Sequence, residues 1–408
     1  MSYTDTLGLR SRPTPAWIKS IRVAYPVEKT LDDLLTRKLT NRTRTGAHKT
    51  DFNELESRLV SYVKAVTGQD DAIISNLKRL TGGASKEQFT FDLTWCRVAG
   101  ENPSGARETR KLILRMDPAE SVVETHRLRE AQVLRAMWGE VPVPEVFWVD
   151  HTGDSLGHPF LIAGFLEGTV QPEDGGKVTG LGMYFEPGLR DALKDQFVRH
   201  LATIHTVDWR RKNLSAYGTP EPGTKQANEW SLGLWERIWQ EDTLEAHPVM
   251  EQAAVWLKEN MPVVDDPVIV HGDYRSGNFM YAADQNNHQQ INAILDWELC
   301  HLGDFHEDLA YNRCKMLGTP DGKGGIRCSG LLYFDEFVEQ YQSYTGYTVN
   351  QKLLTWYDVF THYKMGSISC TGLRVAHEKK THLDAMMNLI GGIGFIGTSE
   401  LQRLLDKL

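Results

Sequence analysis

The segment 271–298 holds the residues of this chain best suited to chemistry. Its sequence HGDYRSGN places Asp273 five residues before Asn278, and the next apolar run, AILDWE, reaches Asp296. Phosphoryl transfer needs a carboxylate that orients an attacking hydroxyl and accepts its proton, and oxygen ligands that hold Mg²⁺ on the nucleotide. Asp273 suits the first role, and Asn278 and Asp296 suit the second. An Asp and an Asn in a glycine-bearing loop also cap ordinary turns, but that alternative leaves Asp296 unexplained.

The apolar pattern before this segment predicts a small sheet. The strand-like runs are short and either alternate or are continuously apolar; they cover 76–80, 87–95, 110–116, 143–150 and 159–166. Residues 51–68 predict a helix, because Asp51 and Glu54 form a capping signal and Gly68 ends the run. A further helical run at 120–138 is expected to pack against the sheet.

Long amphipathic runs after Gly168 predict a mainly helical second unit. They cover 191–209, 230–238 and the tail from about residue 351. The first fifty residues are polar and interrupted by prolines, so we expect an irregular arm or lid there. The fold class is therefore predicted as α+β, with an arm and helix at 1–75, a small lobe at 76–165 and a helical lobe at 166–408.

Composition narrows the functional class. The chain has 408 residues, of which 41% are hydrophobic and 24% charged, as in ordinary folded proteins. A net charge of −9 argues against binding to nucleic acid, and no apolar run approaches the roughly 20 residues that cross a bilayer. The N-terminus shows no secretory signal, and the five scattered cysteines are typical of reduced thiols, so we expect a cytoplasmic protein.

The pattern HGDYRSGN followed by ILDWE resembles the catalytic loop and metal-binding segment of the aminoglycoside phosphotransferase and choline kinase family. The resemblance covers roughly residues 76–320. It implies a bilobal, protein-kinase-like fold with a small antiparallel sheet and one main helix in the first lobe. It also implies ATP and Mg²⁺ as cofactors, Asp273 as the catalytic base, and Asn278 and Asp296 as magnesium ligands.

Neighbouring residues extend this resemblance with one departure. His271 is expected to brace the loop and to take no part as an acid or base. The segment HLGDFHEDLAY (301–311) resembles the stretch that follows the metal-binding Asp in the family, but it has Phe305 where proline is usual. Asp304 and Asp308 in this stretch are expected to cap helices.

The resemblance also assigns a nucleotide site to the first lobe. The turn TGGAS, with Gly82, Gly83 and Ser85, lies where kinases place the loop whose backbone N–H groups approach the phosphates, although two glycines also form ordinary hairpin turns. The family usually has a lysine on the third strand, where this chain has Arg115. Arginine can hold phosphate oxygens in a bidentate fork, and Glu130 matches its acidic partner.

Two readings of this strand stay open. Arg115 and Glu130 are either the phosphate-binding pair or surface charges. Lys111 shares the strand face with Arg115 but lies four residues, about 13 Å, away.

The stretch PFLIAGFLEG (159–168) resembles the hinge between the lobes, so adenine is expected to bond to the backbone near Ala163, Phe165 and Leu166. Arg275, two residues after Asp273, is expected to stabilise charge on the transferred phosphoryl group. The alternative for Arg275 is an ion pair with a surface carboxylate.

The acceptor is harder to predict. Residues 221–260 combine four tryptophans with eight acidic and three basic residues, a composition that suits a cationic acceptor. The simpler interpretation puts the tryptophans in the core and the acidic residues on a solvated face. The eight acidic residues are Glu221, Glu229, Glu236, Glu241, Asp242, Glu245, Glu251 and Glu259, and the four tryptophans are Trp230, Trp235, Trp239 and Trp256.

The leading prediction is an ATP-dependent kinase of a small hydroxylated metabolite. The motifs look most similar to the branch that is fused in some proteins to acyl-CoA dehydrogenases, which implies an apolar or acyl-type acceptor. An aminoglycoside kinase and a nucleotide-binding regulator without transfer activity are the alternatives, and a protein kinase is a fourth. We expect no nucleic-acid or membrane partner, and a homodimer stays open.

Overall fold

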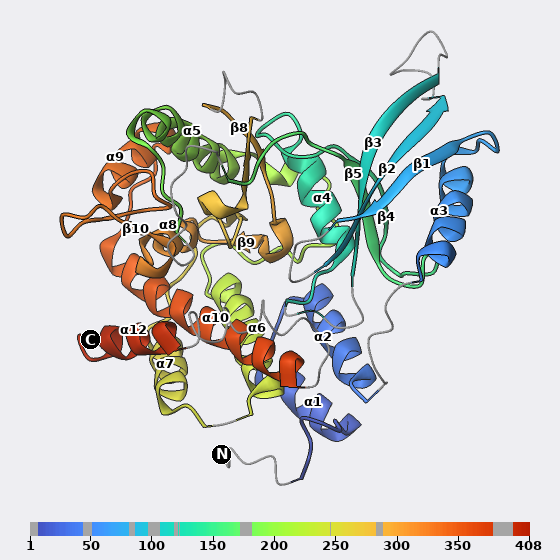
Figure 1. Ribbon diagram of the computed structural model, residues 1–408. Coiled ribbons are helices and arrows are strands. Elements are labelled where there is room, and N and C mark those ends of the chain that lie inside the picture. Colours follow the sequence, from blue (N-terminus) through green and yellow to red (C-terminus); the bar gives the residue numbers. More distant parts are fainter. Residues whose placement is uncertain are drawn as a thin grey trace.

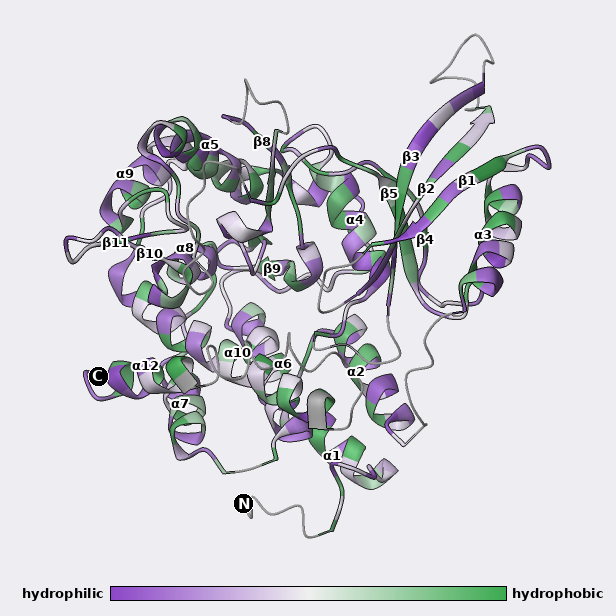
Figure 2. Cartoon of the chain, in the orientation of Figure 1, coloured by the Kyte–Doolittle hydropathy of each residue, from purple (hydrophilic) through white to green (hydrophobic). Residues whose placement is uncertain are grey.

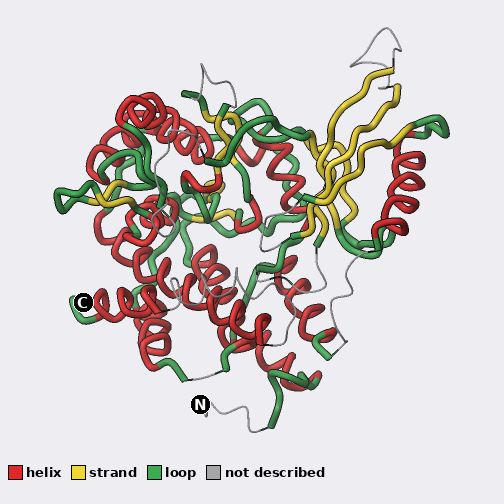
Figure 3. The backbone as a smooth tube through the Cα atoms, in the orientation of Figure 1, coloured by secondary structure: helices red, strands yellow, loops and turns green. Residues whose placement is uncertain are grey.

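A computed structural model of the chain describes residues 7–43, 51–80, 86–96, 107–117, 121, 123–171, 182–244, 246–282, 289–377 and 395–408. Its described parts form two lobes (Figure 1), a twisted sheet flanked by helices and a larger, mainly helical lobe. Figure 3 shows the long strands gathered in the first lobe and most of the helices in the second. The predicted α+β, bilobal architecture is confirmed.

The sheet of the first lobe is antiparallel, with the strand order β1-β2-β3-β5-β4. Its strands are β1 (Ile73–Arg79), β2 (Glu87–Cys96), β3 (Arg107–Met116), β4 (Val146–Asp150) and β5 (Phe160–Gly164). Hydrophobic and hydrophilic residues alternate along β2 and β3 (Figure 2), as a sheet with two different faces requires. Phe91 pairs with Leu112, and Phe89 with Leu114, so the apolar residues of both strands point to one face.

Helices cover both faces of this sheet. On the apolar face, α3 (Phe52–Thr67) buries Leu55, Leu59 and Val63 against β2 and β3. The helix begins where the Asp51 carboxylate accepts two backbone N–H groups and ends at Gly68, which has φ 67°. The opposite face, which includes Arg115, meets α4 (Arg127–Met137). Helix α4 therefore lies between the sheet and the second lobe.

The second lobe is built from long helices around one hydrophobic core. They are α5 (Pro187–Thr206), α6 (Gln226–Asp242), α7 (Pro248–Glu259), α8 (His306–Arg313), α9 (Phe334–Thr345), α10 (Gln351–His377) and α12 (Phe395–Leu405). The predicted stripe of α5, which includes Leu193, Phe197, Leu201 and Ile204, is fully buried in this core.

Short strand pairs interrupt the helices of this lobe. The pairs are β6 (Val268–Val270) with β9 (His301–Gly303), β7 (Phe279–Tyr281) with β8 (Ile291–Ile294), and β10 (Thr319–Pro320) with β11 (Ile326–Arg327). The first two pairs surround the motif HGDYRSGN, so this motif lies on a rigid frame.

The expectation of an irregular N-terminal arm is wrong for residues 15–41. They form α1 (Pro15–Ala24) and α2 (Lys29–Asn41), and α2 packs on α6. Arg237 on α6 donates to Thr36 at 3.0 Å, and Lys38 pairs with Asp242 at 3.0 Å. A Cβ atom at Gly233 would lie 2.0 Å from the Pro26 carbonyl oxygen, so only glycine allows the chain before α2 to approach α6 so closely.

Two broader expectations concern the whole chain. All five cysteines are described and unpaired, as predicted. Across the described ranges, no helix has both the length and the apolar character that crossing a membrane requires.

Candidate active site

The loop after β6 is fixed by contacts to its backbone. Gly272 has φ 80°, and a Cβ atom there would lie 2.8 Å from the Leu299 carbonyl oxygen, so the turn requires glycine. The buried carboxylate of Asp308 accepts the N–H groups of His271 (2.7 Å) and Gly272 (2.9 Å). Lys364 donates to the Gly272 carbonyl at 2.7 Å. The expectation that Asp308 caps a helix is therefore wrong, because it holds this loop.

His271 braces the same loop in its neutral form. Its Nδ1 accepts the N–H of Asp273 (3.2 Å), and its Nε2 lies 3.0 Å from the Leu295 carbonyl, to which it donates. Burial lowers the pKa of His271 despite the nearby carboxylates, which favours this neutral tautomer. Asp304 accepts the N–H of His306 at the start of α8, as expected of a residue at a helix end.

The Asp273 carboxylate accepts three hydrogen bonds. Oδ1 accepts from the Tyr311 hydroxyl and from Arg275 Nε (3.0 Å), and Oδ2 accepts from Asn278 Nδ2 (2.7 Å). Burial, followed by the charge of Asp273, raises the pKa of Tyr311 well above its usual value, so the phenol stays a donor. The Asp273 side chain is 18% exposed, so the carboxylate is not sealed from solvent by these donors.

The β7–β8 hairpin brings Asn278 to Asp296. The N–H of Leu295 donates to the Asn278 carbonyl at 2.8 Å, so Asp296 follows directly after this backbone contact. Asp296 has φ 64° and ψ 52°, a left-handed conformation that is uncommon for a residue other than glycine and recurs at functional sites. The Asn278 side-chain nitrogen faces Asp273, which leaves its amide oxygen as a ligand for a cation.

Asn278 and Asp296 fit a magnesium ion whose remaining ligands include phosphate oxygens. Asn278 and Asp296 offer two hard oxygen ligands, and the Asp296 side chain is 34% exposed. No three His, Cys, Asp or Glu side chains gather around a metal position within the described ranges. The donor set therefore suits Mg²⁺ on a nucleotide better than a metal held by protein alone.

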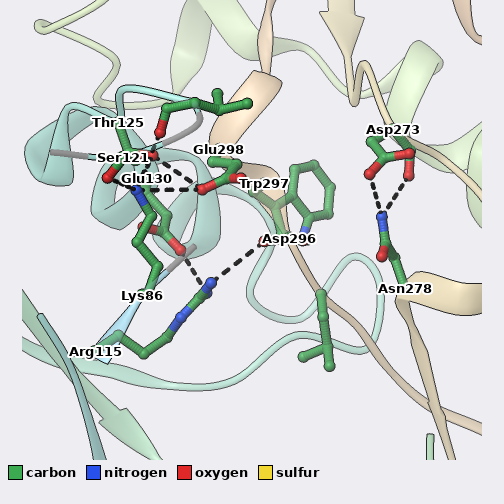
Figure 4. A network of polar contacts seen from close by, with 12 residues as sticks. Lys86, Arg115, Ser121, Thr125, Glu130, Asp273, Asn278, Asp296, Trp297 and Glu298 are labelled. Carbon is green, nitrogen blue, oxygen red and sulfur yellow. Dashed lines mark hydrogen bonds and ion pairs between the residues drawn. The ribbon is translucent and has the colours of Figure 1, made fainter. Parts of the chain in front are cut away.

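The side chain of Arg115 points towards Asp296 (Figure 4). Its Nη1 pairs with Glu130 Oε1 at 2.6 Å, and its Nη2 lies 3.3 Å from Asp296 Oδ1. The ammonium of Lys111 lies elsewhere, 3.9 Å from the centre of the Phe165 ring. Arg115, and not Lys111, is the β3 cation that the fold brings to Asp296.

Sequence reasoning missed Lys86 at this site. Its buried ammonium donates to Thr125 Oγ1 at 2.8 Å and lies 3.5 Å from Glu298 Oε2 (Figure 4). Burial raises the pKa of Glu298 to about 7 although Lys86 opposes the shift. Sequence reasoning also missed the contact of Tyr311 with Asp273. The only sequence signal for Lys86 was its place directly after the glycine-bearing turn.

The remaining predicted residues lie in β5, directly after it, or outside the described ranges. Ala163 is in β5, and the N–H of Phe165 donates to the Lys111 carbonyl at 3.0 Å. That amide is therefore occupied, and Leu166 is the next residue towards the second lobe. Gly82, Gly83 and Ser85 fall outside the residues that the structure describes.

A cavity of about 60 Å³ is lined by residues of α2, α6 and the segment 298–302. Its apolar wall comes from α2 and α6, and its polar end includes Glu298, His301, Glu307 and Lys364. The apolar lining residues are Leu31, Leu34, Leu35, Trp230, Leu234, Trp235 and Ile238. Lys364 joins the cavity to the loop, because the same ammonium binds Glu307 at 3.0 Å and the Gly272 carbonyl.

The simpler interpretation placed the acidic residues of this segment on a solvated face, but three of those in α6 are buried. Glu236 is buried and pairs with Lys258 at 2.7 Å, and Glu241 pairs with Arg237 at 2.6 Å. Asp242 is fully buried among cations that include Lys38. These carboxylates are neutralised within the protein.

Curated proteins similar in sequence to this chain include members of the acyl-CoA dehydrogenase family. The mouse acyl-CoA dehydrogenase family member 10 is 28% identical over 208 residues, which is 50% of this chain and 18% of the relative. The probable acyl-CoA dehydrogenase IBR3 of Arabidopsis thaliana is 27% identical over 282 residues, 65% of this chain and 33% of the relative. The chain thus spans a third or less of the length of these relatives. The predicted resemblance to this branch is confirmed.

Solved structures confirm the fold. A protein of Ralstonia eutropha, provisionally described as an aminoglycoside phosphotransferase, has a TM-score of 0.59 at 22% identity, covering 85% of this chain and 98% of its own. A complex of APH(2'')-IIia with GDP and kanamycin has a TM-score of 0.50 at 18% identity, covering 86% and 99%. The sequence profile described as "Phosphotransferase enzyme family" matches residues 94–322, which include the loop of Asp273 and the hairpin to Asp296. Since this match spans more than half of its length, the chain belongs to the phosphotransferase enzyme family.

Proposed function

We propose that this protein transfers the γ-phosphate of ATP to a hydroxyl group of a small metabolite with an apolar body. The observation that carries the proposal is that Asn278 contacts Asp273, Arg115 contacts Asp296, and the backbone contact between Leu295 and Asn278 brings the two pairs together. A carboxylate, two oxygen ligands and a fixed cation are the protein groups that phosphoryl transfer requires. The lobes meet near residue 165, and we place the reaction in the cytoplasm.

The first lobe would bind the nucleotide. Arg115 is oriented by Glu130 and can turn its guanidinium to the phosphates without leaving that partner. Since the Phe165 amide is occupied, we assign the adenine contacts to the Phe165 carbonyl and the backbone of Leu166. The turn that contains Gly82, Gly83 and Ser85 would cover the phosphates.

The second lobe would carry the chemistry. Tyr311 and Arg275 both donate to Asp273 Oδ1, whereas Oδ2 accepts from Asn278 alone, so Oδ2 would orient the acceptor hydroxyl and take its proton. Arg275 also places a positive charge beside the attack path, which favours the charge that develops on the phosphoryl group. Asn278 and Asp296 would hold magnesium, which when bound neutralises phosphate charge.

The acceptor would bind in the cavity between α2 and α6. Its leucines and tryptophans favour an apolar or acyl-type body, and Lys364 at its polar end donates to the Gly272 carbonyl in the loop that carries Asp273. The buried α6 carboxylates already have cationic partners, so they offer little to a polycationic aminoglycoside. This argues for a metabolic kinase over an antibiotic kinase.

The test is ATP consumption by the purified protein against a panel of hydroxylated metabolites and aminoglycosides. We expect ADP release to depend on Mg²⁺ and on an apolar hydroxylated compound, and phosphorus NMR to show a phosphate monoester. Nucleotide binding without transfer to any compound would favour the regulatory alternative. Turnover with aminoglycosides alone would overturn the assignment of the acceptor.

A further inference from the structure

We propose that Lys364 is a positioning residue that orients Asp273 through the Gly272 carbonyl and through α8. The inference rests on the proposed function, because it concerns how the base of that reaction is held. Lys364 is in α10 and lies outside the family-matched residues 94–322, so the family resemblance assigns it no role. Its side chain is 2% exposed, so the charge of its ammonium must be balanced inside the protein.

The Lys364 ammonium contacts two parts of the chain that meet at Asp273. It donates at 2.7 Å to the Gly272 carbonyl, which belongs to the peptide bond that joins Gly272 to Asp273. It also donates to Glu307 Oε1 at 3.0 Å and lies 4.9 Å from the centre of the Tyr311 ring. Glu307 and Tyr311 are four residues apart in α8, so they lie on the same face of that helix.

These contacts reach Asp273 through its backbone and through its side chain. Gly272 has φ 80° and, as a glycine, wide backbone freedom, so its conformation depends on the hydrogen bonds that hold it. The Asp308 carboxylate accepts its N–H, and Lys364 donates to its carbonyl. Tyr311, whose ring lies under the ammonium, donates to Asp273 Oδ1. One ammonium therefore contacts both the peptide bond before Asp273 and a side chain that binds its carboxylate.

A purely structural role for Lys364 would be to balance the buried charge of Glu307. That carboxylate has a second partner, because His301 Nε2 lies 3.0 Å from its Oε2. Although burial opposes the shift, the charges of His301 and Lys364 lower the pKa of Glu307, so the carboxylate is ionised. Among the described residues, only Lys364 donates to the Gly272 carbonyl. The two roles can therefore be separated, because neutralising Glu307 removes the charge to be balanced but gives the Gly272 carbonyl no new donor.

The test measures ADP release from MgATP with water as the acceptor, which requires no identified substrate. We expect Lys364→Met, which removes the charge at similar length, to lower kcat about tenfold while the KM of ATP changes less than about twofold. Lys352→Met, the same change at an exposed lysine of α10, is the matched control and should equal the wild type in both constants. Lys364→Met combined with Glu307→Gln removes both charges of the pair, so it should recover the melting temperature but keep the low kcat.

Amide hydrogen exchange tests the same inference without catalysis. Peptides that cover residues 271–274 should exchange about tenfold faster in Lys364→Met, while peptides from α5 should exchange as in the wild type. Unchanged exchange in the loop, or faster exchange throughout the second lobe, would overturn the inference.

The kinetic outcomes are equally decisive. A wild-type kcat in Lys364→Met would overturn the inference, as would full recovery of kcat in the double variant, which would reduce Lys364 to a partner of Glu307. If Lys364→Met does not fold, the kcat of the double variant decides between these results. A wild-type protein that releases no ADP with any acceptor would instead refute the proposed function, and exchange in the loop would then decide the inference.

Discussion

Replacing Asp273 by asparagine keeps the shape of the side chain and removes the proton acceptor. The change leaves one oxygen, which can still accept from Tyr311 and Arg275 as Oδ1 does now. The new amide nitrogen then takes the place of Oδ2 and faces the donor Nδ2 of Asn278, which lies 2.7 Å away. The variant therefore loses both the base and one hydrogen bond of the loop.

The two losses differ in size and in where they appear. A positioned acid–base group contributes about 10²–10⁴-fold to the rate, or about 3–5 kcal/mol of activation free energy. A donor that is left facing a donor costs about 1–3 kcal/mol of stability. Because His271, Asp308 and Lys364 still hold the backbone of the loop, the fold should survive this cost.

The assay separates binding from chemistry. We expect single-turnover phosphate transfer by Asp273→Asn to fall about 10²–10⁴-fold while the Kd of ATP changes less than about threefold. Asp335→Asn, the same change at an exposed residue of α9, is the control and should transfer at the wild-type rate. The reasoning is refuted if the variant binds ATP weakly but, once saturated, transfers at the normal rate. Asp273 would then be only a loop residue.

Three further predictions concern the candidate site, and one concerns a histidine outside it. Asp296→Ala should abolish Mg²⁺-dependent transfer and weaken MgATP binding; wild-type turnover would exclude Asp296 from the mechanism. Arg115→Ala should raise the KM of ATP and lower kcat, whereas Lys111→Ala should have little effect, and the reverse result in steady-state kinetics would contradict the assigned cation. Tyr311→Phe should lower kcat about tenfold, by loss of one hydrogen bond to a charged group, without changing the Kd of ATP in calorimetry; a kcat equal to wild type would disprove its role. Burial lowers the pKa of His200 to about 4, so its contribution to stability is present above pH 6.5 and is lost as the pH falls towards 4; thermal melts should show this, and His200→Gln should reduce the slope.

Local signals account for the parts of the fold that were predictable. The alternation of Phe89, Phe91 and Leu93 predicts a strand because side-chain direction has a period of two along the chain. Asp51 and Gly68 mark helix ends because their effects reach only a few residues. The spacing of HGDYRSGN is likewise local, so the residues of this loop could be assigned by resemblance.

The missed features depend on distant partners or on a misjudged proline. Tyr311 lies 38 residues from Asp273 in the sequence, and Glu298 is even further from Lys86. No local sequence pattern could therefore predict either contact. The burial of Asp242 could not be predicted from the sequence around it, because its cationic partners lie on other helices. The prolines of the first fifty residues predict an irregular segment. Pro15, however, is at the first position of α1, where proline is favourable, and the Thr14 side chain caps the helix.

The wall of the cavity has an evolutionary consequence. Leu31, Leu34 and Leu35 belong to α2, which precedes the family-matched residues 94–322, whereas the catalytic loop lies within them. Substitutions on α2 can therefore reshape the cavity without disturbing Asp273 or Asp296. In the proposed acceptor site, such a separation would let substitutions change which compound is accepted without altering the residues proposed for the reaction. Exchanging residues 15–43 between related proteins would change the α2 side of the cavity and leave its α6 side, which lies within 94–322, unchanged.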